Sequence, residues 1–419
     1  MKRIAFFGPL PPSRTGIADY DEELLPLLRK HFQVDVFLES GIPLEHVFPH
    51  TDFYLRNKQK PYDLCLYQLG NSMFHDYIYG YLYHFPGAVV FHDVCLHHSR
   101  AGILLRQGQL KEFAQEATLE HPQGETIALL NWTHTAGFLL PYFFPFVKLV
   151  LRSCLAGAAH TDTGVENLRI TDSPVVKIPH LELSTQVDPG PDPFPGKFVI
   201  GSFGLATRAK RLPAVLNALA SLRRYYPNLL YLLAGDVEPH YDLHSEIKRR
   251  RVQDIVHLTG HIEMDQFLRL LRRADVTVNL RYPSAGEMSG TLVRALACGK
   301  PVLISRLAHL QEIPSEAVLR VRPDYEEDDV FNHLSRLIEN PDLRKRIGSA
   351  ARNYVDKNHS PELATQKYCE FIELALERKS NFKPPELPLH LRSGKEIVRS
   401  YVKRTCFENK ESDLLDWIL

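Results

Sequence analysis

Short runs of β-branched and other apolar residues alternate with segments of helical periodicity along most of the sequence. Alternation of this kind predicts a parallel sheet covered by helices, because neighbouring parallel strands need a helix-length connection between them. Such a sheet collects ligands at the carboxyl ends of its strands, so the residues that follow each strand are the candidates for a site. The predicted strands of the first half are residues 3–7, 34–38, 63–67, 88–92, 156–160 and 175–178.

A proline-rich segment divides the sequence, and the same alternation restarts after it. Residues 184–196 contain four prolines and two glycines, a composition typical of a linker. A chain of 419 residues also exceeds the usual size of a single core. We therefore predict an N-terminal domain at 1–183 with a helical insertion at 102–152, a linker at 184–196 and a C-terminal domain at 197–360. Residues 361–419 are predicted to form a helix long enough to reach back across the domain interface and a proline-rich, then helical and basic tail, which could pack on the N-terminal domain or bind elsewhere.

The bulk composition disfavours several classes of protein. Lys plus Arg equals Asp plus Glu at 50 each, which argues against a dedicated nucleic-acid binder. Six scattered cysteines without a C-x-x-C pair indicate free thiols in a reducing compartment. The N-terminus enters a strand without the pattern of a signal peptide, so we expect a cytoplasmic location. The apolar aromatic stretch 137–151 contains two prolines and a lysine, which disfavours a membrane span but leaves peripheral contact with the inner face of the membrane open.

The turn at residues 286–291, Gly-Glu-Met-Ser-Gly-Thr, precedes a predicted helix and follows a predicted strand. Free backbone N–H groups and the positive end of the helix dipole at such a turn suit a phosphate. The carboxylate of Glu287 suits hydroxyl groups instead, as on a sugar. Phosphate plus polyol describes a nucleotide sugar. The alternative is an ordinary turn in which the helix dipole favours Glu287.

Basic residues follow the first strand of the second half. Arg208, Lys210 and Arg211 lie in the turn that begins at Gly204, where they could neutralise a diphosphate. Three cations at a helix start oppose the helix dipole, and a bound anion would relieve that conflict. The alternative is a helix start on the surface.

Polar and glycine-containing turns also follow three strands of the first half. The rigid proline-rich turn at 8–20 holds Gly16 and Ile17, the turn at 68–75 holds Asn71, and His92 and Asp93 end the fourth strand. We expect these residues to contact polar substrate, although the proline-rich turn could be purely structural. A metal site at His92, Asp93 and His97 is disfavoured because the spacing fits no common zinc pattern, and His97 and His98 could simply begin the next helix.

These features together resemble the family-4 glycosyltransferases of GT-B fold (group 1 type), which have two Rossmann-like domains facing across a cleft. The resemblance rests on Gly-Glu-Met-Ser-Gly at 286–290 followed by Arg-Ala-Leu-Ala-Cys-Gly-Lys-Pro-Val at 294–302, and it covers about residues 1–375. The segment 11–20 and the strand exit at His92 and Asp93 look like a bacterial subgroup.

The resemblance implies roles for individual residues. Glu287 would be the carboxylate near the donor sugar, Lys210 the phosphate-binding lysine, and His92 the histidine that faces the transferred sugar. The implied donor-binding residues are Arg208, Met288, Ser289, Gly290, Thr291, Gly204, Asn279 and Arg281, and the implied acceptor-side residues are Gly16, Ile17, Asp93 and Asn71.

Three positions depart from the family pattern. The place of the usual second glutamate is taken by Arg294, and counting from that position puts the first glutamate at Gly286, so that Glu287 is displaced by one residue. The usual ribose carboxylate is therefore missing. The arginine usual after the glycine of the first turn is Leu205, which leaves Arg208 as a substitute.

The resemblance implies a retaining, metal-independent transfer of a hexose from a UDP- or GDP-sugar to a hydroxyl of a glycan, lipid-linked or other acceptor, in bacterial polysaccharide or glycoconjugate synthesis. It implies no cofactor. One alternative is a non-catalytic nucleotide-sugar binder or partner subunit with a degenerate site. Another is a GT-B enzyme of a different reaction, such as an epimerase or a phosphorylase. A Rossmann dehydrogenase is disfavoured because no G-x-G-x-x-G follows the first strand of either half.

Overall fold

The computed structural model describes residues 1–39, 44–133, 140–182, 187–188 and 190–392. These residues form two compact units, which are described separately. The first unit comprises Met1–Pro179, Ala285–Glu287 and the chain from Glu362 onward, and the second comprises His180–Ser284 and Met288–Pro361.

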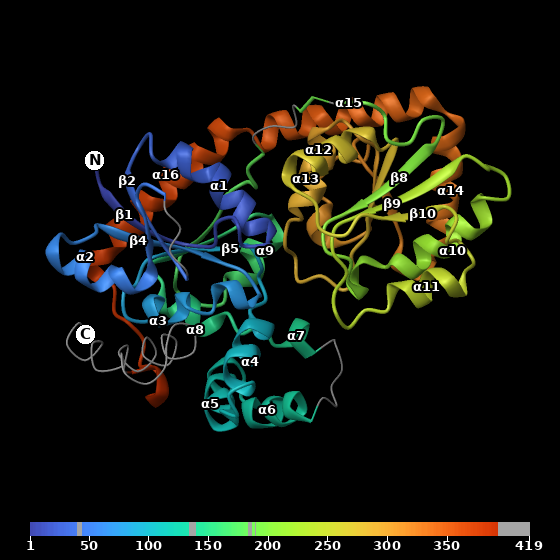
Figure 1. The fold of residues 1–419 in the computed structure, drawn as a ribbon. Coiled ribbons are helices and arrows are strands. Elements are labelled where there is room, and N and C mark those ends of the chain that lie inside the picture. Colours follow the sequence, from blue (N-terminus) through green and yellow to red (C-terminus); the bar gives the residue numbers. More distant parts are fainter. Residues whose placement is uncertain (40–43, 134–139, 183–186, 189, 393–419) are drawn as a thin grey trace. The chain divides into compact units, whose positions relative to one another are not determined.

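The first unit is built on a seven-stranded sheet in the order β3-β2-β1-β4-β5-β6-β7, with every pair of neighbours parallel (Figure 1). The strand order reverses at β1, whose neighbours are β2 and β4, so the switch point lies between β1 and β4. The short strand β3 has no counterpart among the predicted strands. The strands are β1 Arg3–Phe7, β2 Gln33–Leu38, β3 Val47–Pro49, β4 Leu64–Leu69, β5 Ala88–Phe91, β6 Ala156–Ala159 and β7 Val175–Lys177.

Helices cover this sheet, and four more form a cluster of their own in Figure 1. The covering helices are α1 Gly16–Leu28, α2 Phe53–Gln59, α3 Ile78–Leu82, α8 Lys148–Ser153, α9 Asp162–Leu168 and α16 Pro361–Arg378. The cluster consists of α4 His97–Leu105, α5 Leu110–Glu120, α6 Gly124–Trp132 and α7 Leu140–Phe143. Helix α4 begins at His97, shortly after β5 ends at Phe91.

The aromatic run of the insertion divides between core and surface. Phe146 is buried and stacks on Phe113 with ring centroids 5.0 Å apart. Tyr142 and Phe144 are half-buried, whereas Phe143 is 73% exposed. The run therefore serves mainly as the core of this helical cluster, with one ring at the surface. Phe138 lies outside the described residues.

The second unit is built on a six-stranded sheet in the order β10-β9-β8-β11-β12-β13, again with parallel neighbours. Its switch point lies between β8 and β11. Buried residues of α10 and α14 belong to one hydrophobic core, and those of α12 and α13 belong to another. Figure 1 shows these helices beside the sheet. The elements are β8 Phe198–Phe203, α10 Leu212–Leu222, β9 Leu229–Ala234, α11 Leu243–Arg249, β10 Val256–Leu258, α12 Met264–Arg273, β11 Val276–Asn279, α13 Gly290–Ala297, β12 Val302–Ser305, β13 Leu319–Val321, α14 Glu326–Glu339 and α15 Pro341–Asn358.

The two parallel-sheet units confirm the predicted fold class. Within the described residues, no helix is both long and apolar enough to cross a membrane. The predicted basic, helical tail falls largely in residues 393–419, outside the described part of the chain.

Candidate functional site

Two glycines let the exits of β8 and β9 approach each other in the second unit. Gly204 has a φ of +78° and Gly235 a φ of +139°, both in the region that favours glycine. A Cβ atom on Gly235 would lie 2.7 Å from the carbonyl carbon and oxygen of Gly204. A larger residue at Gly235 would therefore require a backbone shift, and one at Gly204 would be strained by the positive φ.

Lys210 folds back over the β8 exit from a short 3-10 helix, Arg208–Lys210. Its Nζ donates a hydrogen bond to the carbonyl oxygen of Phe203. A Cβ atom on Gly204 would lie 3.4 Å from this Nζ and 3.2 Å from Cγ2 of Thr291, so the ammonium group lies beside the first turn of α13. Burial, with a smaller contribution from Arg281, lowers the pKa of Lys210 to about 7.

The other two cations of this turn have different surroundings. Arg211 donates from Nε to both carboxylate oxygens of Glu326, at 2.9 and 2.8 Å. This ion pair relieves part of the conflict with the helix dipole. Arg208 and Leu205 are exposed. Lys210 is consequently the cation of this turn that lies beside α13.

Polar side chains from the β11 exit meet the start of α13. Asn279 donates from Nδ2 to Oγ1 of Thr291 at 2.9 Å, and Arg281 donates from Nη2 to Oγ of Ser289 at 3.3 Å. The two hydroxyl groups are 3.0 Å apart, and Ser289 caps the helix by accepting the N–H of Leu292. The predicted donor-binding residues Gly204, Lys210, Asn279, Arg281, Ser289, Gly290 and Thr291 thus come together at the switch point between β8 and β11.

This cluster has the charge of an anion site. Lys210 and Arg281 interact with each other as like charges beside a helix N-terminus, where the dipole adds further positive potential. In the part of the chain that the structure describes, Lys210 forms no ion pair with a carboxylate; its partner is a backbone carbonyl. Two cations, hydroxyl donors and free helix amides around one point can bind a phosphate or diphosphate.

Glu287 lies in the loop that leads into α13, next to Gly286, which has a φ of +106°. The Glu287 side chain is half-buried, and its Oε2 accepts the backbone N–H of Ala285 at 3.0 Å. Met288, the next residue, is buried in the core beside α13. The carboxylate therefore also stabilises its own loop.

Arg294 is buried in α13 and has an acidic partner that the sequence pattern did not indicate. Its Nη1 lies 3.5 Å from Oε1 of Glu182, and both side chains are largely buried. Glu182 is held in turn by a hydrogen bond from its backbone N–H to the carbonyl oxygen of His359. The position expected to carry a carboxylate thus carries the cationic half of a buried ion pair.

In the first unit, three of the predicted acceptor-side residues come together at the exits of β4 and β5. The backbone N–H of Asn71 donates to Oδ2 of Asp93 at 2.7 Å. A Cβ atom on Gly70 would lie 2.4 Å from Cδ1 of Ile17 and 3.2 Å from the same Asp93 oxygen. Gly16 begins α1 after the cap residue Thr15 and is exposed.

His92 lies at the end of β5 and is 8% exposed. Its Nε2 is 2.7 Å from Oε1 of Gln68, and its Nδ1 is 3.2 Å from Nε2 of His160. Sequence reasoning did not select Gln68 or His160 as site residues. Both nevertheless lie at strand ends, Gln68 on β4 and His160 after β6, so the strand-exit rule applied to every strand would have found them.

His97 does not join this group. Its Nδ1 is 2.6 Å from the carbonyl oxygen of Phe144, and its Nε2 is 3.0 Å from Oδ1 of Asn131. Together with its place at the start of α4, these contacts give His97 a structural role in the helical cluster.

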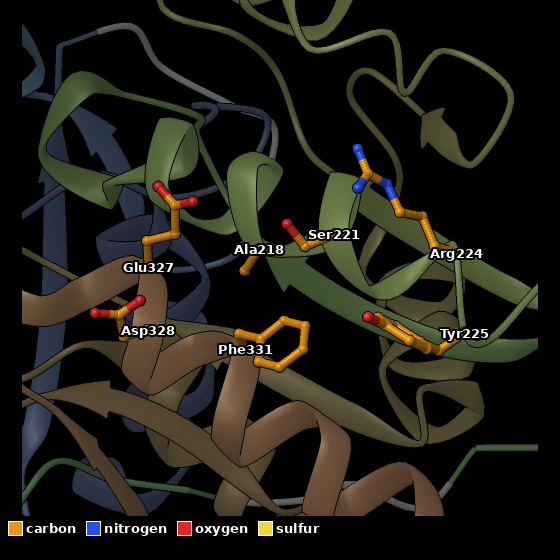
Figure 2. Close-up of a pocket in the computed structure, with 7 residues that line it drawn as sticks. All are labelled: Ala218, Ser221, Arg224, Tyr225, Glu327, Asp328 and Phe331. Carbon is orange, nitrogen blue, oxygen red and sulfur yellow. The ribbon is translucent and has the colours of Figure 1, made fainter.

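A pocket of about 260 Å³ lies elsewhere on the second unit, between α10 and α14 (Figure 2). Side chains of helices line it, and it contains none of the predicted site residues. A ligand there would lack the strand exits and glycine turns described above. The lining residues are Ala218, Ser221, Arg224, Tyr225, Glu327, Asp328 and Phe331.

Comparison with known proteins shows which families and folds this chain is similar to. Residues 188–354 match the family model described as "Glycosyl transferases group 1". Among curated relatives, an uncharacterized glycosyltransferase of Methanocaldococcus jannaschii, MJ1069, is 19% identical over 181 residues, which cover 43% of this chain and 46% of that protein. The gpi3 subunit of phosphatidylinositol N-acetylglucosaminyltransferase of Schizosaccharomyces pombe is 28% identical over 131 residues, which cover 31% and 28%. The matches thus span less than half of the length of these relatives.

Solved structures match nearly the whole chain. Sucrose-phosphate synthase of Thermosynechococcus elongatus has a TM-score of 0.63 at 17% identity, covering 89% of this chain and 98% of that one. Anabaena Alr3699/HepE, solved in complex with UDP-glucose, has a TM-score of 0.60 at 15% identity, covering 89% and 100%. WaaG, a glycosyltransferase involved in lipopolysaccharide biosynthesis, has a TM-score of 0.60 at 15% identity, covering 88% and 99%. The fold is therefore the GT-B fold of glycosyltransferases.

Proposed function

We propose that the protein is a glycosyltransferase that moves a hexose from a UDP- or GDP-sugar to the hydroxyl group of an acceptor. The observation that carries the proposal is the convergence of Lys210, Arg281 and the first turn of α13 at a switch point. That arrangement suits the diphosphate of a nucleotide sugar. The family match over residues 188–354 and the UDP-glucose bound to Alr3699/HepE support the same ligand class.

The proposed reaction retains the anomeric configuration and needs no metal. The bond between C1 of the sugar and the diphosphate oxygen breaks, C1 bonds to the acceptor oxygen, and the acceptor proton passes to the departing phosphate. The large electrostatic cost is the negative charge that develops on the diphosphate. Lys210, Arg281 and the amides at the start of α13 would stabilise that charge without reorganising. We place the reaction in bacterial polysaccharide or glycoconjugate synthesis, at the cytoplasmic side of the membrane.

Glu287 is proposed to contact the donor sugar, and Glu287→Ala is expected to abolish transfer. The loss arises because the alanine variant has no carboxylate to accept hydrogen bonds from the sugar hydroxyl groups, whereas the core of the unit remains intact. Release of UDP from UDP-glucose, with a cell extract as acceptor source, measures the effect. Glu287→Gln keeps an oxygen for the Ala285 N–H and serves as the matched control for loop structure. A fully active alanine variant would remove Glu287 from the site.

A non-catalytic nucleotide-sugar binder is the second candidate. Two observations favour it: Gly286 and Arg294 occupy the positions where the resemblance expects glutamates, and Glu287 is hydrogen-bonded within its own loop. Both candidates predict that UDP- or GDP-sugars raise the melting temperature, because a ligand of the folded state stabilises it. Release of free nucleotide in the presence of acceptor is expected from the enzyme alone. A thermal-shift screen without any nucleotide response would contradict both.

A further inference from the structure

A chain of buried polar side chains crosses the strand exits of the first unit. Gln68 contacts Nε2 of His92 at 2.7 Å, and Nδ1 of His92 lies 3.2 Å from Nε2 of His160. Nδ1 of His160 lies 2.9 Å from the backbone carbonyl oxygen of Ile178. These residues come from the exits of β4, β5, β6 and β7, which are neighbours in the sheet.

The row of buried polar side chains continues on the other side of Gln68. The hydroxyl of Tyr368, on α16, lies close enough to the Gln68 amide to affect its own ionisation. It also lies 3.0 Å from the hydroxyl of Tyr20, on α1. The Tyr20 ring stands edge-on to His92 with centroids 4.9 Å apart, so Tyr20 both ends the chain and packs on its central histidine.

The backbone carbonyl of Ile178 determines the direction of the hydrogen bonds from His160 back to Gln68. A carbonyl oxygen only accepts, so Nδ1 of His160 carries a proton. Nε2 of a neutral His160 is then an acceptor, and Nδ1 of His92 must donate to it. This leaves Nε2 of a neutral His92 with a lone pair that needs a donor.

The amide of Gln68 supplies that donor when its NH2 group faces His92. In that orientation the hydrogen bonds from Gln68 through His92 and His160 to Ile178 all run in one direction. The opposite direction fails, because it places a lone pair of His160 against the lone pairs of the Ile178 carbonyl. Amide oxygen and nitrogen exchange places by a rotation of the amide group, so the hydrogen-bond network decides between the two.

We propose that Gln68 and His160 are positioning residues that hold His92 as a neutral imidazole with its proton on Nδ1. A sugar hydroxyl then meets a hydrogen-bond acceptor at Nε2, in place of the Gln68 amide, and His92 binds this hydroxyl without removing its proton. The inference rests on the proposed function, because it assigns His92 to sugar binding.

Several ionisable groups surround this row of side chains. Tyr20 packs on His92, and burial holds the pKa of Tyr368 well above its usual range. Burial likewise raises the pKa of Asp21, which is fully buried and lies close to Gln68, since both would contact a Cβ atom on Gly8. The carboxylate of Asp93 accepts a hydrogen bond from the backbone N–H of Asn71.

Histidine-selective ¹⁵N NMR of the full chain at pH 7.5 tests the tautomer, with the His92→Gln variant providing the assignment. The expected wild-type spectrum shows a protonated Nδ1 and an unprotonated Nε2 for His92. Gln68→Glu places a carboxylate against Nε2 and is expected to turn His92 into an imidazolium with both nitrogens protonated. A wild-type His92 with its proton on Nε2, or doubly protonated, would overturn the proposal.

Two His160 variants separate positioning from folding. His160→Gln retains an acceptor for the His92 Nδ1–H and is expected to keep the wild-type tautomer and most of the turnover of UDP-glucose. His160→Leu removes the acceptor and is expected to lose the Nδ1–H tautomer. It is also expected to lose about 10- to 100-fold in kcat, the range known for residues that orient a metal-binding histidine. Equal turnover and unchanged tautomers in both variants would refute the role of His160. The NMR measurement uses ligand-free protein, so it decides the tautomer even when the proposed function itself fails.

Discussion

Lys210→Ala is expected to weaken the binding of UDP-glucose about 10- to 100-fold, because one charge-assisted hydrogen bond contributes roughly 1.5–3 kcal/mol. The ammonium group lies between the β8 exit and the start of α13, where no carboxylate of the described residues competes for it. Isothermal titration calorimetry measures the dissociation constant directly. The fold should survive, since the lysine contributes a single hydrogen bond to a backbone carbonyl.

Arg208→Ala is the matched control for this prediction. It removes the same charge from the same short 3-10 helix, but Arg208 is exposed, so its effect on affinity should be small. Equal losses in the two variants would mean that only the overall charge of the turn matters. An unchanged affinity in Lys210→Ala would remove Lys210 from the donor site.

The same site should link donor binding to pH. The pKa of Lys210 is about 7 in the free protein, so much of the lysine is neutral above pH 7. A bound diphosphate favours the charged form and raises this pKa, so binding takes up a proton and affinity declines as the pH rises above 7. Calorimetry at pH 8 in buffers of different ionisation enthalpy should detect this proton in the wild type and not in Lys210→Ala.

The strands could be predicted from the sequence because they are local patterns. The strand predicted at residues 3–7 has the bounds that the structure gives β1, since Ile4–Phe7 is a continuous apolar run followed by a glycine. Strand β3, Val47–Pro49, was not predicted. It has only three residues and ends in a proline, so its sequence shows no alternation of apolar and polar residues. Its pairing with β2 depends on the tertiary structure.

The site could be predicted only in part, because some of its contacts join segments that are far apart in the sequence. Ser289 and Thr291 belong to one strand-turn-helix segment, and the segment alone indicates an anion site. The approach of Lys210 to Thr291 depends on β8 and β11 being neighbours, which the chain order does not reveal. Tyr368 was missed because it lies on a different helix, far along the chain from Tyr20, which it contacts.

Arg294→Ala is expected to lower the free energy of unfolding of the second unit by about 3–5 kcal/mol, the usual cost of removing one partner from a buried ion pair. The variant leaves the carboxylate of Glu182 in a buried position, 3.5 Å from where the guanidinium group was. Urea unfolding followed by circular dichroism measures the change. Arg249→Ala, which breaks the exposed pair with Glu246 in the same unit, should cost less than about 1 kcal/mol.

The double variant Glu182→Met/Arg294→Met distinguishes a structural ion pair from a ligand-binding one. Replacing both charges with apolar side chains is expected to recover most of the stability lost in Arg294→Ala, because neither charge of the pair then stays buried. If the pair only supports the helix that carries Ser289 and Thr291, the double variant should bind UDP-glucose like the wild type. A large loss of affinity in a stable double variant would instead assign Glu182 or Arg294 to the donor. This chain would then recognise the nucleotide with the carboxylate of Glu182 in place of the missing helix glutamate.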